Sequence, residues 1–190
     1  MPLARKHKKH FSYADYLQWD ETVRAELIEG EVYDMTPAPS RKHQEVSMAL
    51  SVIFGTYLKG RKCRVFAAPF DVRLPGKSKD DSDITTVVQP DLSIICDEKK
   101  LDTRGCLGAP DLIVEILTPE TAAKDMREKT ALYEKHGVNE YWIIHPLDKT
   151  VMVFHLGGDG MYARPVTYSA QDRVRVKTLK GFAVDLSEIF

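Results

Sequence analysis

The stretch VEILTPETAAKDMREKTALYEKHGVNEYWIIHP, from Val114 to Pro146, decides the fold because its hydrophobic period changes twice. Together with the preceding residues it gives a continuous apolar run at Leu112–Leu117, which suits a short strand buried on both faces. Thr118 is a good N-cap, and the polar and apolar residues of Pro119–His136 predict a helix. Glu140–Ile144 predicts a further strand. The stretch is therefore a strand–helix–strand unit.

Further elements are expected on both sides of this unit. We predict a short helix at 11–18 capped by Ser12, a hairpin around Glu29-Gly30, a helix from Ser40 to Lys59, a strand from Arg64 to Leu74, a strand at Leu92–Cys96, a loop at Asp102–Gly108, a hairpin with the turn GGDG, and a closing strand and turn. This order predicts a mixed α/β fold with extra hairpins at both ends.

Length and composition predict one globular domain over residues 1–190, with residues 1–10 as a basic tail. The hydrophobic share of 43% and the charged share of 29% are ordinary for such a domain. No apolar run approaches the roughly 20 residues that span a bilayer, so we expect no contact with a membrane. The start of the chain lacks the apolar segment of a secretory signal.

The cysteines Cys63, Cys96 and Cys106 are odd in number and widely spaced, without a C-x-x-C pair. Such spacing argues against a disulfide framework and against a zinc knuckle. We therefore expect all three to be bystanders and the protein to lie in the reducing cytoplasm.

The charge pattern permits contact with nucleic acid without requiring it. The formal net charge is −1, whereas a protein that binds phosphates tightly usually has a basic excess. Basic residues do gather near the start of the chain and at both ends of the helix predicted for 40–59. For each cluster alone, a solvated surface is the simpler interpretation.

Glu115 is the unexpected residue of the strand Leu112–Leu117. Alternation places Asp111, Ile113 and Glu115 on one face, and an ionised acid inside an apolar strand is costly unless it is paired or binds a metal. Glu115 could be one half of a buried ion pair. Alternatively, it could be a ligand of Mg²⁺, which proteins hold through one or two carboxylates, waters and substrate phosphate.

Two more residues favour the metal interpretation. Asp91, in QPDLSIIC (Gln89–Cys96), opens a strand and would meet Glu115 if the two strands pair in parallel or near-parallel register. Lys129 falls on the same helical stripe as Met126 and Tyr133, which predicts that it points inward. An inward lysine needs a carboxylate, although an i,i+4 pair with Asp125 is the simpler alternative. Two acids and a lysine together suit phosphoryl chemistry.

Glu26 and His43 are supporting candidates. Glu26 could complete a metal site, and it could equally pair with Arg24 or Lys129. His43 lies on the inward stripe of the helix predicted for 40–59, where it could line a cleft or be a satisfied core histidine.

These residues resemble a known family. Pro90-Asp91 and Val114-Glu115, on strands followed by a helix, resemble the PD-(D/E)XK restriction-endonuclease-like superfamily. The chain more closely resembles the bacterial putative restriction endonucleases that are abundant in cyanobacteria. The similarity extends from about Phe11 to the C-terminus. Its most specific positions are Glu115, Thr118, Asp125, Lys129, Tyr133, Gly137-Val138 and Glu140-Tyr141-Trp142, with Glu26, Gly30 and His43 as further matches.

The resemblance implies a restriction-endonuclease-like core, which is a central mixed sheet flanked by helices. It departs from the superfamily pattern at Leu117, where a lysine is expected two residues after the acid. The resemblance and the helical stripe together make Lys129 the substitute, with Lys124 as a second candidate. Asp111, in the second Pro-Asp pair, is a reserve metal ligand.

The expected function is that of a Mg²⁺- or Mn²⁺-dependent endonuclease that acts on DNA. Asp91 and Glu115 would hold the metal, and Lys129 would orient water or stabilise the transition state. Enzymes of this kind commonly act as homodimers, which the resemblance implies here. The alternative is a non-catalytic nucleic-acid-binding or protein-assembly module that keeps the fold.

Overall fold

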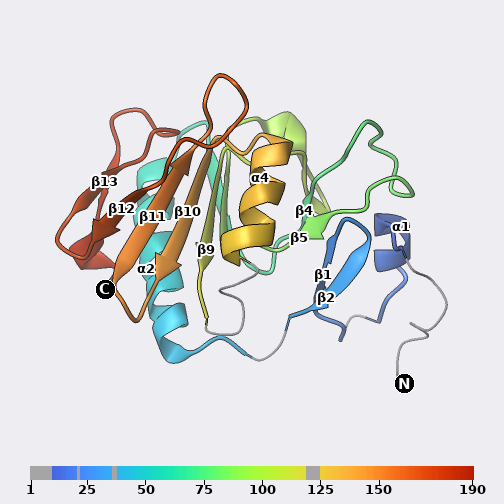
Figure 1. Cartoon of the computed structure of the whole chain (residues 1–190), viewed down its shortest axis with the longest axis horizontal. Helices are drawn as coiled ribbons and strands as arrows, with labels where there is room; N and C mark the ends of the chain where they lie inside the picture. Colours follow the sequence, from blue (N-terminus) through green and yellow to red (C-terminus); the bar gives the residue numbers. More distant parts are fainter. Residues whose placement is uncertain (1–9, 21, 36–37, 119–124) are drawn as a thin grey trace.

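The computed structural model describes residues 10–20, 22–35, 38–118 and 125–190 and arranges them around two six-stranded sheets (Figure 1). The larger sheet has the order β12 (Val166–Ser169), β11 (Thr150–His155), β10 (Glu140–His145), β9 (Leu112–Ile116), β6 (Leu92–Ile95) and β3 (Arg64–Ala67). The smaller sheet has the order β2 (Glu31–Asp34), β1 (Ala25–Ile28), β5 (Val87–Val88), β4 (Val72–Arg73), β8 (Gly105–Leu107) and β7 (Leu101–Asp102). A separate hairpin consists of β13 (Arg173–Arg175) and β14 (Ala183–Asp185).

The helices cover both faces of the larger sheet. The described helices are α1 (Tyr13–Tyr16), α2 (Arg41–Leu58), a π-helix η2 (Asp125–Lys129) that continues into α4 (Thr130–His136), and the 3-10 turns η1 (Glu98–Lys100) and η3 (Leu186–Glu188). Figure 1 shows α4 in front of the larger sheet and α2 behind it. None of these helices is long and apolar enough to cross a membrane.

Alternation along β9 sends its side chains into two different cores. Val114 and Ile116 belong to the core that α2 covers, whereas Ile113 belongs to the core that contains α4 and part of the smaller sheet. The larger sheet is mixed, because β9 pairs with β10 in parallel and with β6 in antiparallel direction. The mixed α/β class and the central mixed sheet flanked by helices are thereby confirmed.

Several local predictions are confirmed. Ser12 caps α1 in a capping box with Asp15, and the Ser40 hydroxyl accepts a hydrogen bond from the His43 backbone amide at the start of α2. The β1–β2 hairpin turns at Glu29 and Gly30, which both have positive φ. Gly30 is also required sterically, because a Cβ there would lie 2.1 Å from the His10 ring.

Two predictions at the junction of the sheets are wrong. The stretch Arg64–Leu74, predicted as one strand, contains two: β3 joins the larger sheet and β4 joins the smaller one, with residues 68–71 between them. The loop predicted for Asp102–Gly108 instead contains most of the β7–β8 hairpin. Its closest backbone approach is at Gly105, where a Cβ would lie 2.2 Å from the Asp71 carbonyl oxygen.

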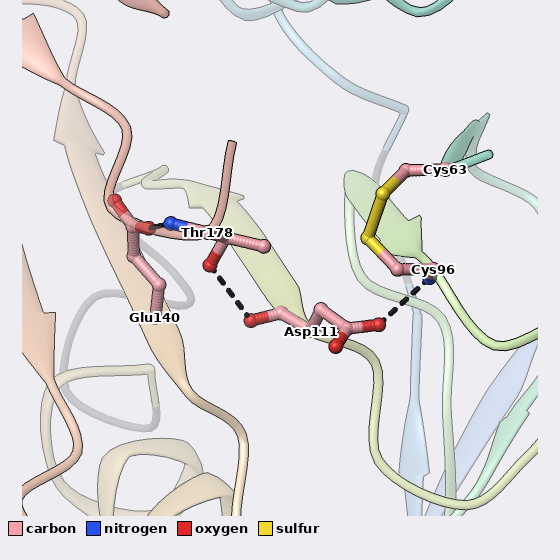
Figure 2. The surroundings of a disulfide bond; sticks show 5 residues. All are labelled: Cys63, Cys96, Asp111, Glu140 and Thr178. Atoms are coloured by element: carbon pink, nitrogen blue, oxygen red, sulfur yellow. Dashed lines mark hydrogen bonds between the residues drawn. A yellow bond between two sulfur atoms is a disulfide. The ribbon is translucent and has the colours of Figure 1, made fainter. Parts of the chain in front are cut away.

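The expectation that all three cysteines are bystanders is also wrong, because Cys63 and Cys96 form a disulfide (Figure 2). Arg64 is opposite Ile95 in the antiparallel β3–β6 pair, so the next residues outward, Cys63 and Cys96, face each other. Cys106 is free and buried, and burial raises its thiol pKa to about 11. This thiol therefore stays protonated and unreactive at neutral pH.

The disulfide should stabilise the chain measurably. Cys63 and Cys96 are separated by 33 positions, and the entropy of closing a loop of that length corresponds to about 3–4 kcal/mol. We expect the Cys63→Ser/Cys96→Ser variant to lose about that amount in urea unfolding. Dithiothreitol should lower the unfolding midpoint of the natural protein and leave that of the variant unchanged. Equal midpoints for the two oxidised proteins would contradict the linkage.

Candidate functional site

Glu115 lies on β9 and is only 4% exposed, so its carboxylate must be held by other groups. Its Oε1 accepts hydrogen bonds from Lys129 Nζ at 2.8 Å and from the Tyr133 hydroxyl at 2.6 Å. Both donors come from the helical segment η2–α4 on the same face of the larger sheet. The predicted meeting of Lys129 with Glu115 is present, and Glu115 is a member of a buried ion pair.

Lys129 is shared between two carboxylates. Its Nζ lies 2.8 Å from Glu115 Oε1 and 2.9 Å from Glu26 Oε1, and all three side chains are nearly fully buried. Of the two partners predicted for Glu26, the ion-pair partner is therefore Lys129. Because Glu26 belongs to β1, this one ammonium connects the smaller sheet, the larger sheet and the η2–α4 segment.

The inward direction of Lys129 was predicted correctly, but that of Met126 was not. Met126 is 42% exposed. Asp125–Lys129 is a π-helix, in which hydrogen bonds connect i and i+5, so the angular spacing differs from the α-helical stripe that grouped Met126 with Lys129. The π turn thus carries Lys129 into the site and leaves Met126 in solvent.

Tyr133 is a permanent donor to this cluster. Complete burial, followed by the charges of Glu115 and Glu26, raises the pKa of the phenol well above its usual value. The hydroxyl therefore keeps its proton and donates to Glu115 at neutral pH.

Asp91 lies beside Glu115, but by a different pairing from the one expected. Strands β6 and β9 are antiparallel, with Leu92 opposite Val114, and do not have the parallel or near-parallel register on which this meeting was made conditional. Continuing this register by one residue places Asp91 opposite Glu115. Asp91 Oδ2 also accepts a hydrogen bond from the Ile116 amide at 2.7 Å, which attaches the carboxylate to the same strand as Glu115.

His43 contacts the other oxygen of Asp91. Its Nε2 lies 3.1 Å from Asp91 Oδ1, and the side chain is 7% exposed. Its Nδ1 is buried without a hydrogen-bond partner among the described residues. His43 is therefore not the satisfied core histidine of the simpler interpretation, and it orients Asp91 from the first turn of α2.

Asp111 does not join this cluster. Asp111 lies at the opposite end of β9 from Ile116, where its Oδ2 accepts from the Cys96 amide and its carbonyl accepts from the Thr178 hydroxyl (Figure 2). Asp111 thus ties the disulfide region to the C-terminal segment. The Lys124 position and the Asp125 side chain lie outside the described residues, so the alternative pair of Asp125 with Lys129 is untested.

Gln89 is a contact residue that sequence reasoning missed. Its backbone amide donates to Glu26 Oε1 at 3.1 Å, on the same oxygen that Lys129 approaches. Its position directly before Pro90-Asp91 is the feature of the sequence that could have indicated a place near the site.

Among the described residues, no group of three or more His, Cys, Asp and Glu side chains is arranged to hold a metal ion. A two-carboxylate site formed by Asp91 and Glu115 is the smaller arrangement that these residues offer. Hard cations such as Mg²⁺ prefer carboxylate oxygens and take their remaining ligands from water and phosphate.

Comparison with known proteins identifies the family. The model of the Uma2 family, described as "Putative restriction endonuclease", matches residues 13–187. The chain belongs to the Uma2 family. Because the match covers the two sheets and the η2–α4 segment, it includes every residue of the cluster around Lys129. The resemblance to the bacterial putative restriction endonucleases is thereby confirmed.

Two further proteins are similar to this chain over most of its length. An uncharacterized protein of Synechocystis sp. is 28% identical over 176 residues, which cover 90% of this chain and 88% of that protein. The crystal structure of a putative nuclease belonging to DUF820 from Anabaena variabilis is similar with a TM-score of 0.73 and 21% identity, over 95% of this chain and 97% of that one. At 21% identity, the similarity to the Anabaena variabilis protein shows that the two chains share a fold.

The ion pairs of Lys129 predict a large effect on stability. Lys129→Met would leave the buried Glu26 and Glu115 carboxylates without their shared ammonium, and breaking a buried pair on one side costs about 3–5 kcal/mol. Urea unfolding of the variant measures this loss.

The matched control is Lys135→Met on the same helix. Lys135 pairs with Glu29 at the surface, where an ion pair contributes within about 1 kcal/mol. Similar small losses for both variants would contradict the central role of Lys129.

Proposed function

We propose that this chain is a divalent-metal-dependent endonuclease that hydrolyses DNA phosphodiester bonds. The observation that carries the proposal is the gathering of carboxylates at one place on this family's fold. Three carboxylates lie in one cluster of the described residues: Glu26 and Glu115 share the ammonium of Lys129, and Asp91 adjoins Glu115 through the Ile116 amide. Carboxylate oxygens are the ligands that a hard divalent cation prefers, so such a cluster favours binding of Mg²⁺ or Mn²⁺.

Asp91 and Glu115 would hold Mg²⁺ or Mn²⁺. When bound, the ion would polarise the phosphate and lower the pKa of a bound water. His43 and the Ile116 amide orient the Asp91 carboxylate, and Tyr133 orients that of Glu115. Lys129 would hold the attacking water or offset the negative charge that develops on the phosphate. Glu26 keeps the Lys129 ammonium in place.

Exposure indicates the side from which a phosphate would approach. The Asp91 side chain is 19% exposed, whereas the side chains of Glu115 and Lys129 are each 5% exposed. A phosphodiester would therefore first meet Asp91, and Lys129 would act from behind the carboxylates. We further propose that two copies assemble to cut both strands of a duplex. A DNA substrate favours the cytoplasm, although the Cys63–Cys96 disulfide removes the cysteine argument for that compartment.

One observation favours a different function. Lys129 already pairs with both Glu26 and Glu115, as expected if the family's site residues serve only to hold the fold together. The second candidate is therefore a non-catalytic nucleic-acid-binding or protein-assembly module. Such a module needs no metal, so metal binding separates the two functions.

The experiment is a calorimetric Mn²⁺ titration combined with cleavage of plasmid DNA. For the nuclease, we expect Asp91→Asn and Glu115→Gln each to weaken Mn²⁺ binding by at least about tenfold and to abolish cleavage. Asp148→Asn is the control, because its carboxylate is exposed in the β10–β11 turn, and it should behave as the natural protein. A folded natural protein that binds no Mn²⁺ would support the module and contradict the nuclease.

A further inference from the structure

The segment that carries Asp91 crosses from one sheet to the other. Residues 89–91 connect β5 of the smaller sheet to β6 of the larger sheet, and residues 68–71 make the reverse crossing from β3 to β4. Two hydrogen bonds join the crossings. The Ala68 amide donates to the Asp91 carbonyl at 3.1 Å, and Gln89 Nε2 donates to Asp71 Oδ1 at 2.8 Å.

Gln89 makes contacts in two directions. Its side-chain amide donates to Asp71 Oδ1 and, at 3.2 Å, to the Tyr16 hydroxyl, which itself donates to Asp71 Oδ1. Its backbone amide donates to Glu26 Oε1 in the opposite direction. Gln89 is thus fixed at both its side chain and its backbone, between α1, the β4 entry and β1.

Pro90 makes the connection from Gln89 to Asp91 stiff. A proline ring fixes its own φ and restricts the residue before it, so few torsions separate the anchored Gln89 from the Asp91 carboxylate. Pro90 is also buried, which limits its displacement. A change in the position of Gln89 is therefore transmitted to Asp91.

We propose that Gln89 is a positioning residue for Asp91 and Glu26, acting through the hydrogen bond of its side chain to Asp71. The side-chain amide of Gln89 fixes the start of the 89–91 segment to Asp71, next to the smaller sheet. The Asp91 carboxylate then reaches the Ile116 amide, and the backbone N–H of Gln89 holds Glu26 against Lys129. The consequence for metal binding rests on the proposed nuclease function, whereas the positioning of Asp91 does not.

Hydrogen exchange at one amide reports this positioning without any metal. The Ile116 amide donates to Asp91 Oδ2, while the next amide on the strand, that of Leu117, donates to the Ile144 carbonyl. Gln89→Met keeps the length and the backbone N–H of residue 89 and removes the side-chain amide. We expect Ile116 to exchange about tenfold faster in this variant and Leu117 to exchange at its natural rate.

Two other variants make the test specific. Asp71→Ala removes the acceptor of the same hydrogen bond, so it should accelerate Ile116 in the same selective way and remain informative if Gln89→Met does not fold. Combining both changes should add little to the exchange rate of Ile116, because each already removes the hydrogen bond between Gln89 and Asp71. Gln171→Met, at an exposed glutamine in a turn, should leave both amides unchanged.

The outcomes separate this inference from the proposed function. Unchanged exchange at Ile116, or equal acceleration at Ile116 and Leu117, would overturn the positioning role. Selective acceleration together with Mn²⁺ affinity reduced by about tenfold would support both the positioning role and the metal site. Selective acceleration in a protein whose natural form binds no Mn²⁺ would support the positioning of Asp91 and contradict the nuclease.

Discussion

The buried ion pairs of Lys129 with Glu26 and Glu115 hold the two sheets and the η2–α4 segment together. The Lys129 ammonium holds Glu26 from the smaller sheet and Glu115 from the larger sheet, and it comes from the helix that covers the larger sheet. Removing three charged groups from water is costly, so each of them requires the others in place. The same arrangement brings the carboxylates of Glu26 and Glu115 close to that of Asp91. Residues that hold the two sheets together therefore also form a candidate site for a divalent metal.

Features that depend on neighbouring residues could be predicted from the sequence. Ser40 caps α2, and the Glu29-Gly30 turn joins β1 to β2, because capping and positive φ are local requirements. The inward direction of Lys129 followed from helical spacing, and the burial of Glu115 followed from its apolar strand. Burial of two opposite charges on adjacent elements then made their contact predictable.

Features that depend on register or on a change of helix type could not be predicted. Pairing of Cys63 with Cys96 requires the alignment of β3 with β6, which neither cysteine reveals. The position of Asp91 next to Glu115 results from an antiparallel register, which is fixed by the crossing between sheets rather than by either strand. The Met126 side chain is 42% exposed because it belongs to a π turn, and an α-helical period does not predict the direction of side chains in such a turn.

The proposed nuclease requires Asp91 and Glu115 to share one divalent cation beside Lys129. Crystals soaked in Mn²⁺ and measured at a wavelength where manganese scatters anomalously would test it most directly. We expect one strong anomalous peak with oxygen atoms of both carboxylates at roughly 2.1–2.2 Å. A soaked crystal without a peak at these carboxylates, with Lys129 still bridging Glu26 and Glu115, would contradict it.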